Sequence, residues 1–117
     1  MRVAIPKETY EGEGRVAAAP SAVRGLVGAG HEVWVEQSAG LDSGFADDEY
    51  IRAGAAVATT AEECLDRGEL VWKVLRPSAH ERTLLRPGQR VAACHHAGDD
   101  VSGHVHLERI EVEGRRP

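Results

Sequence analysis

Short strand-like runs alternate with helix-like segments along this chain, and this alternation constrains the fold more than any other feature. The run Leu70–Val74 is almost wholly apolar, which is typical of a strand buried on both faces of a sheet. Glu32–Glu36 alternates between polar and apolar residues, and this period of two predicts another strand. Three further strands are expected at Arg2–Ile5, Ala56–Ala58 and Arg90–Cys94.

Segments with helix signals lie between these strands. Pro20 suits the first turn of a helix, and Gly30 is the kind of residue at which that helix ends. Thr60 and Glu63 form a capping-box pattern at the start of another helix, which should end near Gly68. Two shorter helices are expected at Asp47–Ala53 and Ser78–Leu85. The alternation predicts a single compact α/β domain, with a mainly parallel sheet flanked by helices.

Charge and composition exclude several classes of protein. The formal net charge is −5, so the chain lacks the basic surface that nucleic-acid binding requires. No apolar run approaches the length of a membrane span, and the short apolar N-terminus is interrupted at Pro6, unlike a signal peptide. The two cysteines form no disulfide framework. We therefore expect a cytoplasmic protein that binds neither nucleic acid nor membrane.

Several short motifs recur with the spacing of one known family. They are Ile5-Pro6-Lys7-Glu8, Glu13-Gly14-Arg15-Val16-Ala17 with Pro20, Ala29-Gly30-His31-Glu32-Val33, Ser43-Gly44-Phe45, Ala53-Gly54-Ala55 and Leu85-Arg86-Pro87-Gly88-Gln89. On these residues the chain resembles the N-terminal, substrate-side domain of the alanine dehydrogenase and nicotinamide nucleotide transhydrogenase family. The resemblance implies a Rossmann-like or flavodoxin-like substrate domain over residues 1–117. It covers about residues 1–100, and residues 101–117 diverge.

The chain also departs from the pattern of the family that it resembles. This chain has Ala19 where the family usually has a hydroxyl residue. It has Leu75 where a second basic residue often follows the family lysine. The sequence contains no Gly-x-Gly-x-x-Gly loop, and Gly12-Glu13-Gly14 lacks the third glycine of that dinucleotide-binding motif. We therefore expect a stand-alone form of the domain that uses no cofactor and does not bind NAD by itself.

The resemblance gives Arg15 and Lys73 roles at a substrate. It implies that Arg15 clamps the substrate carboxylate, because a planar guanidinium forms two parallel, charge-assisted hydrogen bonds to a carboxylate. A solvated loop arginine is the alternative.

The resemblance also implies that Lys73 takes part in catalysis and holds a carbonyl or carboxylate oxygen of the substrate. A buried ammonium is costly unless it is paired, so we expect the strand end to present Lys73 to a pocket; pairing with a structural acid is the alternative.

The resemblance also implies a histidine that acts as an acid or base at the substrate carbonyl. His96 matches this position, and an imidazole suits the role because it titrates near neutral pH. The neighbouring His95 is assigned to substrate binding, and a shift of one residue in the alignment would exchange the two roles. A histidine at a strand end that bonds only to backbone is the alternative.

A metal site competes with this interpretation of the histidines. Residues with possible ligand side chains are close in sequence at Cys94, His95, His96, His104 and His106. Histidine and thiolate ligands suit zinc or another transition metal, but the spacing fits no established motif. We therefore expect no metal.

Arg15, Lys73 and His96 together predict a pocket for a short 2-oxo or 2-amino acid at the carboxyl ends of parallel strands. We expect an enzyme of non-redox chemistry, such as an isomerase, a lyase or a cyclising enzyme. The alternative is a non-catalytic binding module, or a subunit of a split alanine dehydrogenase-like oxidoreductase with a separate nucleotide-binding subunit. A homodimer is also expected, because it would cover the apolar surface left by the missing closing elements of the family domain.

Overall fold

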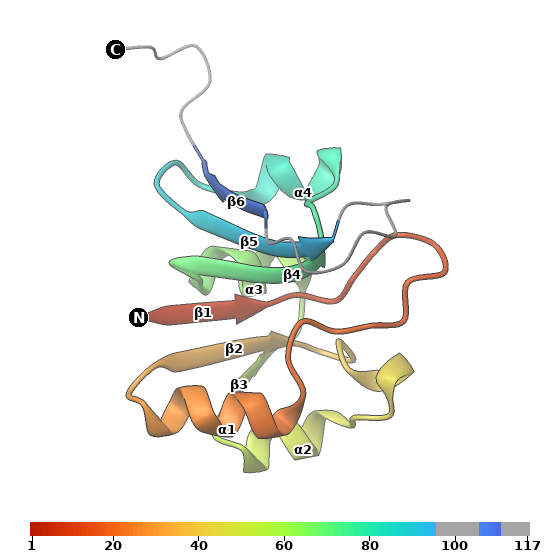
Figure 1. The fold of residues 1–117 in the computed structure, drawn as a ribbon, viewed down its shortest axis with the longest axis vertical. Coiled ribbons are helices and arrows are strands. Elements are labelled where there is room, and N and C mark those ends of the chain that lie inside the picture. Colours follow the sequence, from red (N-terminus) through yellow and green to blue (C-terminus); the bar gives the residue numbers. More distant parts are fainter. Residues whose placement is uncertain (96–105, 111–117) are drawn as a thin grey trace.

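The computed structural model describes residues 1–95 and 106–110. They form a six-stranded sheet with helices on both faces, in the strand order β3-β2-β1-β4-β5-β6 (Figure 1). The strands are β1 (Arg2–Ile5), β2 (Glu32–Glu36), β3 (Ala56–Ala58), β4 (Leu70–Leu75), β5 (Arg90–His95) and β6 (His106–Arg109). The helices are α1 (Pro20–Gly28), the 3-10 turn η1 (Leu41–Ser43), α2 (Asp47–Arg52), α3 (Ala61–Arg67) and α4 (Ala79–Leu84). The expected α/β architecture is therefore confirmed.

The order in which successive strands are added reverses at the centre of the sheet. β1, β2 and β3 follow one another outward on one side, and β4 then pairs with the other side of β1. The pairs among these strands and between β4 and β5 are parallel, whereas β6 is antiparallel to β5. The boundary between β1 and β4 is a topological switch point, where the connections that leave the two strands turn to opposite sides.

Two apolar layers cover the faces of the sheet. On one face, β-strand residues pack against α1 and α2, with Val3, Ile5, Val33, Val35 and Val23 among the buried side chains. On the other face Val71 and Val91 pack with Cys64 and Leu65 of α3. Alternate residues of each strand serve opposite layers, as the period of a strand requires. Burial raises the pKa of the Cys64 thiol to about 12, so this cysteine contributes as a small apolar side chain.

Tyr50 joins α2 to the connection between β1 and α1. Its side chain is fully buried, and its hydroxyl donates a 2.7 Å hydrogen bond to the carbonyl oxygen of Ala18. Gly40 lies against the same ring, because a Cβ there would come within 2.7 Å of the Tyr50 hydroxyl and ring carbon. The absence of a side chain at Gly40 is therefore a packing requirement.

No helix among the described residues is long and apolar enough to cross a membrane.

Replacing Tyr50 with phenylalanine should lower the free energy of unfolding by about 1–2 kcal/mol, because the buried Ala18 carbonyl would lose its hydroxyl donor. Urea denaturation of both proteins measures the difference. Tyr10→Phe is the matched control, since the Tyr10 hydroxyl makes no hydrogen bond within the described part of the chain. Equal losses in the two variants would contradict a specific role for the Tyr50 hydroxyl.

Candidate functional site

The polar centre of the molecule lies where β1 and β4 separate. The two strands pair only at Val3 with Leu70 and at Ala4 with Val71, although β4 continues beside β5 as far as Leu75. The backbone N–H groups of β4 that would otherwise face a strand need acceptors. Glu8 provides them: its carboxylate accepts 2.8 Å and 3.2 Å hydrogen bonds from the N–H groups of Val74 and Leu75.

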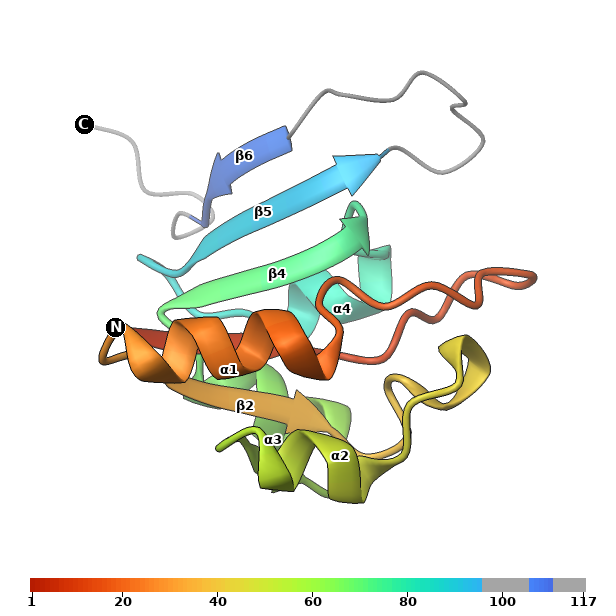
Figure 2. The ribbon, with the colours of Figure 1, turned by 60° about the horizontal axis from the view of Figure 1, so that its bottom comes forward.

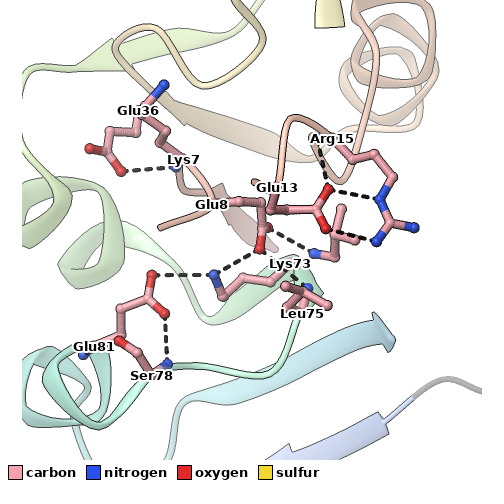
Figure 3. A network of polar contacts seen from close by, with 10 residues as sticks. Lys7, Glu8, Glu13, Arg15, Glu36, Lys73, Leu75, Ser78 and Glu81 are labelled. Carbon is pink, nitrogen blue, oxygen red and sulfur yellow. Dashed lines mark hydrogen bonds and ion pairs between the residues drawn. The ribbon is translucent and has the colours of Figure 1, made fainter. Parts of the chain in front are cut away.

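Lys73 completes this arrangement as a buried cation between two acids. Its ammonium lies 3.1 Å from Glu8 Oε1 and 3.2 Å from Glu81 Oε2, and its side chain is 0% exposed (Figure 3). Glu81 belongs to the capping box of α4, where its other oxygen accepts a 2.8 Å bond from the Ser78 N–H. Lys73, Glu8 and Glu81, here called the buried ion triad, therefore join β4, α4 and the segment that follows β1.

This geometry differs from the sequence-based expectation for Lys73. The strand was expected to present the ammonium to a substrate pocket, but the side chain points into the interior and two carboxylates contact its ammonium. The reason is burial: an ammonium that loses its water needs fixed counter-charges, and the fold supplies them from two neighbouring elements. Lys73 thus has the contacts of a structural ion pair, which was the alternative from the sequence, and its role in substrate binding and catalysis stays a prediction.

Arg15 lies on the connection between β1 and α1, residues 6–19, at the carboxyl edge of the sheet. It lines a cavity of about 260 Å³ together with Val16, Ala17, Ala19, Ser43, Phe45 and Val74. Its guanidinium is 56% exposed and forms two 2.7 Å hydrogen bonds to the carboxylate of Glu13, seen beside the buried ion triad in Figure 3. A cavity of this size with a cation at its wall suits a small acid.

Two contacts hold the Arg15 connection against the rest of the domain. Ser43 of η1 donates a 2.7 Å hydrogen bond to the Gly14 carbonyl, next to Arg15. The N–H of Lys7 donates a 2.9 Å bond to the carboxylate of Glu36 at the end of β2. Burial raises the pKa of Glu36, and the Lys7 N–H opposes this rise. Neither Ser43 nor Glu36 can be assigned to the site from the sequence alone, because neither contact follows from local spacing.

The two histidines remain predictions. His95 is the last residue of β5, and its backbone pairs in register with Leu75, so β5 ends at the same sheet edge as β4. The His95 side chain and the whole of His96 lie outside the residues whose placement is described, as do the side chains of the possible metal ligands Cys94, His104 and His106. Within the described residues, no three His, Cys, Asp or Glu side chains are grouped as they would be around a metal ion.

The described residues do not fit a dinucleotide cofactor. In the dinucleotide-binding fold, the first strand leads through a tight glycine-rich turn into a helix whose N-terminus receives the pyrophosphate. Here β1 ends at Ile5 and α1 begins at Pro20, so a long connection separates them. That connection carries Arg15 and the Glu8 carboxylate in place of a phosphate cradle.

The fold is a doubly wound α/β domain with a small cavity beside its switch point, and comparisons with known proteins identify its family. The chain matches the family described as "Alanine dehydrogenase/PNT, N-terminal domain" over residues 4–112. It is 47% identical over 100 residues to an NAD(P) transhydrogenase subunit alpha protein of Rhodospirillum rubrum, covering 81% of this chain and 26% of that protein. It is 43% identical over 89 residues to alanine dehydrogenase of Methanococcus maripaludis, covering 76% and 24%.

Solved structures agree with this assignment. A transhydrogenase from Sinorhizobium meliloti superposes with a TM-score of 0.75 at 41% identity, covering 81% of this chain and 28% of the other. An L-alanine dehydrogenase gives a TM-score of 0.72 at 44% identity, covering 74% and 24%. The chain belongs to the alanine dehydrogenase/PNT N-terminal domain family, and it spans about a quarter of the length of these relatives.

The family overturns the main functional expectation from the sequence. The relatives are dehydrogenases and a transhydrogenase subunit, which are redox proteins, so the expected cofactor-free isomerase, lyase or cyclising enzyme is wrong. The expectation relied on the absence of a glycine loop in these 117 residues, and that absence concerns only the portion of the relatives that the chain covers. The alternative, a subunit of a split alanine dehydrogenase-like oxidoreductase, agrees better with the comparisons.

Replacing Lys73 with methionine should lower the free energy of unfolding by about 3–5 kcal/mol, because Glu8 and Glu81 would remain buried without their counter-charge. Thermal or urea unfolding measures the loss. Lys7→Met is the control and should lower the free energy of unfolding much less, since the half-buried Lys7 amine makes a 3.4 Å contact with a backbone carbonyl and not with buried carboxylates.

The triple variant Lys73→Met, Glu8→Gln, Glu81→Gln separates charge from packing. It should be more stable than Lys73→Met alone, because the two uncompensated carboxylates are gone. If the triple variant is less stable than the single one, unpaired charge is not the cause of the loss.

Proposed function

We propose that this chain is the substrate-side portion of an alanine dehydrogenase- or transhydrogenase-like oxidoreductase, and that its cavity takes a small 2-oxo or 2-amino acid. The observation that carries the proposal is the position of Arg15 at the wall of a 260 Å³ cavity beside the β1–β4 switch point. Ligands of open α/β sheets bind outside the carboxyl ends of strands at such a point. A guanidinium there favours a carboxylate ligand.

The redox step requires a nicotinamide that the described residues do not fit. We propose that a dinucleotide-binding domain outside these 117 residues supplies it, as a continuation of the chain or as a separate subunit. The names of the relatives support this division, since they are dehydrogenases and a transhydrogenase of which the chain covers about a quarter. The role of His96 as the acid or base at the substrate carbonyl, with His95 beside it, stays within this proposal.

One face of the sheet supports a contact with a partner. No described helix lies over β5 and β6 on the face that carries α1, as the view in Figure 2 shows. Leu107 of β6 is 73% exposed, and a cavity of about 380 Å³ there is lined by Leu70, Arg90, Val91, Leu107, Glu108 and Arg109. The expected homodimer would use this face, although another domain of a larger protein could occupy it equally well. The homodimer and the cytoplasmic location stay predictions.

Replacing Arg15 with glutamine should weaken the binding of pyruvate, the 2-oxo acid that corresponds to alanine, by about tenfold or more. A hydrogen bond to a charged group contributes about 1.5–3 kcal/mol, and about 1.4 kcal/mol corresponds to a factor of ten in affinity. Isothermal titration calorimetry measures both affinities. Arg24→Gln removes an exposed charge from α1 and should leave binding unchanged. Equal affinity of wild type and Arg15→Gln for pyruvate would sink the proposal.

The chain by itself should show no saturable binding of NADH at micromolar concentrations, because the β1–α1 connection does not form a phosphate cradle. The nicotinamide fluorescence of NADH, titrated with the protein, provides the measurement. The same preparation must be folded by circular dichroism for a negative result to count. A saturable rise in fluorescence would show that these residues hold the dinucleotide and would overturn the division proposed above.

A further inference from the structure

The face of the sheet that carries α1 has an apolar row that no described helix covers over β5 and β6 (Figure 2). Trp72 of β4, Ala92 of β5 and Leu107 of β6 pair in register across the three strands, so their side chains lie on one face. Trp72 packs against the apolar layer that includes α1, which identifies this face, and Leu107 is 73% exposed. An exposed apolar row of this kind is typical of a surface that contacts another protein.

Two arginines border the apolar row. Arg90 and Arg109 pair in register across β5 and β6, and both are exposed. Arg90 is two residues before Ala92 and Arg109 is two residues after Leu107, so both arginines lie on the face of the row. They line the cavity of about 380 Å³ together with Leu107. Within the part of the chain that the structure describes, neither arginine forms an ion pair.

Like charges that lie directly opposite each other destabilise a pair of strands. Most other cations of the site and its surroundings have an acid beside them, as Lys73 has Glu8 and Arg86 has Asp66. A carboxylate above the arginine pair would remove the repulsion and form charge-assisted hydrogen bonds to the guanidinium groups. The surface therefore combines an apolar row with a basic border that favours an acidic partner.

The charges on this face argue against a second copy of the chain as its occupant. The sequences of β4, β5 and β6 contain one acid, Glu108. Glu108 alternates with Arg109 along β6, so its side chain lies on the opposite face, where it pairs with Arg82 of α4. Two copies that met through the α1 face of these strands would bring together two arginine pairs without a strand carboxylate between them.

We propose that this face binds an amphipathic helix of a partner protein, with apolar residues over the row from Trp72 to Leu107 and carboxylates beside Arg90 and Arg109. Helices are the elements that cover open sheet faces in α/β domains. A helix of about twelve residues is ~18 Å long, which is close to the ~20 Å length of the six-residue strand β5. This inference does not depend on the ligand of the Arg15 cavity.

A designed peptide and one tryptophan test the inference. Trp34→Phe leaves Trp72, in the apolar row, as the only tryptophan of the chain. The probe is a capped helical peptide of about twelve residues with leucine at positions i, i+3, i+4 and i+7 and glutamate beside them. It should shift the emission of Trp72 to shorter wavelength with saturation, because it would remove water from the ring. The absence of a saturable shift would overturn the inference.

A second peptide, with lysine in place of every glutamate, measures the contribution of charge. It should bind about tenfold or more weakly, since like charges across an interface are strongly unfavourable. The net charge of −5 makes this comparison stringent, because non-specific attraction would favour the basic peptide. Equal or tighter binding of the lysine peptide would overturn the inference.

Charge reversal on the protein gives an independent measurement. The double variant Arg90→Glu, Arg109→Glu should prefer the lysine peptide. The matched control is Arg24→Glu, Arg52→Glu, which makes the same change in net charge at exposed positions of α1 and α2 and should keep the preference for the glutamate peptide. If both double variants change preference alike, net charge and not this face determines binding, and the inference falls.

Sedimentation velocity distinguishes a partner from a second copy. Leu107 is exposed, so Leu107→Glu should leave the fold intact and abolish binding of the glutamate peptide, while the sedimentation coefficient of the peptide-free protein stays that of wild type. A wild-type dimer that Leu107→Glu converts to a monomer would show that a second copy occupies this face and would overturn the inference.

Discussion

A single buried ammonium determines how the centre of this domain is arranged. Where β1 and β4 separate, the sheet loses the backbone pairing that would satisfy β4, and the Glu8 carboxylate takes the place of the missing strand. A carboxylate in the interior requires a positive partner, and Lys73 of β4 provides it. The ammonium then contacts Glu81, whose other oxygen caps α4. Strand separation, loop position and helix start therefore depend on one another.

This dependence has a consequence for the ligand site. The connection of residues 6–19 contains no helix or strand, yet Glu8 holds one end of it, and Ser43 holds the middle through Gly14. The position of the segment that carries Arg15 thus follows from a contact at the adjacent Gly14 and from the contacts of Glu8 earlier in the connection. A carboxylate ligand needs a guanidinium held close to its binding geometry, because ordering the side chain only at the moment of binding would cost free energy.

The regular portion of the fold was predictable from the sequence, because strand periodicity and capping patterns are local signals. The expected strands at Arg2–Ile5, Glu32–Glu36 and Ala56–Ala58 have the bounds of β1, β2 and β3, and the Thr60 cap is present at α3. The site was less predictable. The partners of Lys73 are Glu8, in a connection with no periodicity, and Glu81, on a later helix, so only the tertiary structure brings them together. The resemblance located Arg15, whereas the Ser43 contact that holds the neighbouring Gly14 exists only in the folded chain.

Burial distinguishes the two cations Lys73 and Arg15 at this edge of the sheet. Lys73 is fully buried, and removing its ammonium from Glu8 and Glu81 to reach a ligand would leave two acids without a counter-charge. The guanidinium of Arg15 is 56% exposed, although the Glu13 side chain that it contacts is only 10% exposed. Solvent can reach this guanidinium, whereas moving the Lys73 ammonium to a ligand would dismantle the junction of β4 and α4. An arginine also keeps its charge when it is partly desolvated, which a lysine does less readily. The guanidinium of Arg15 can therefore meet a carboxylate from solvent, whereas the Lys73 ammonium joins the strand and the helix beneath it.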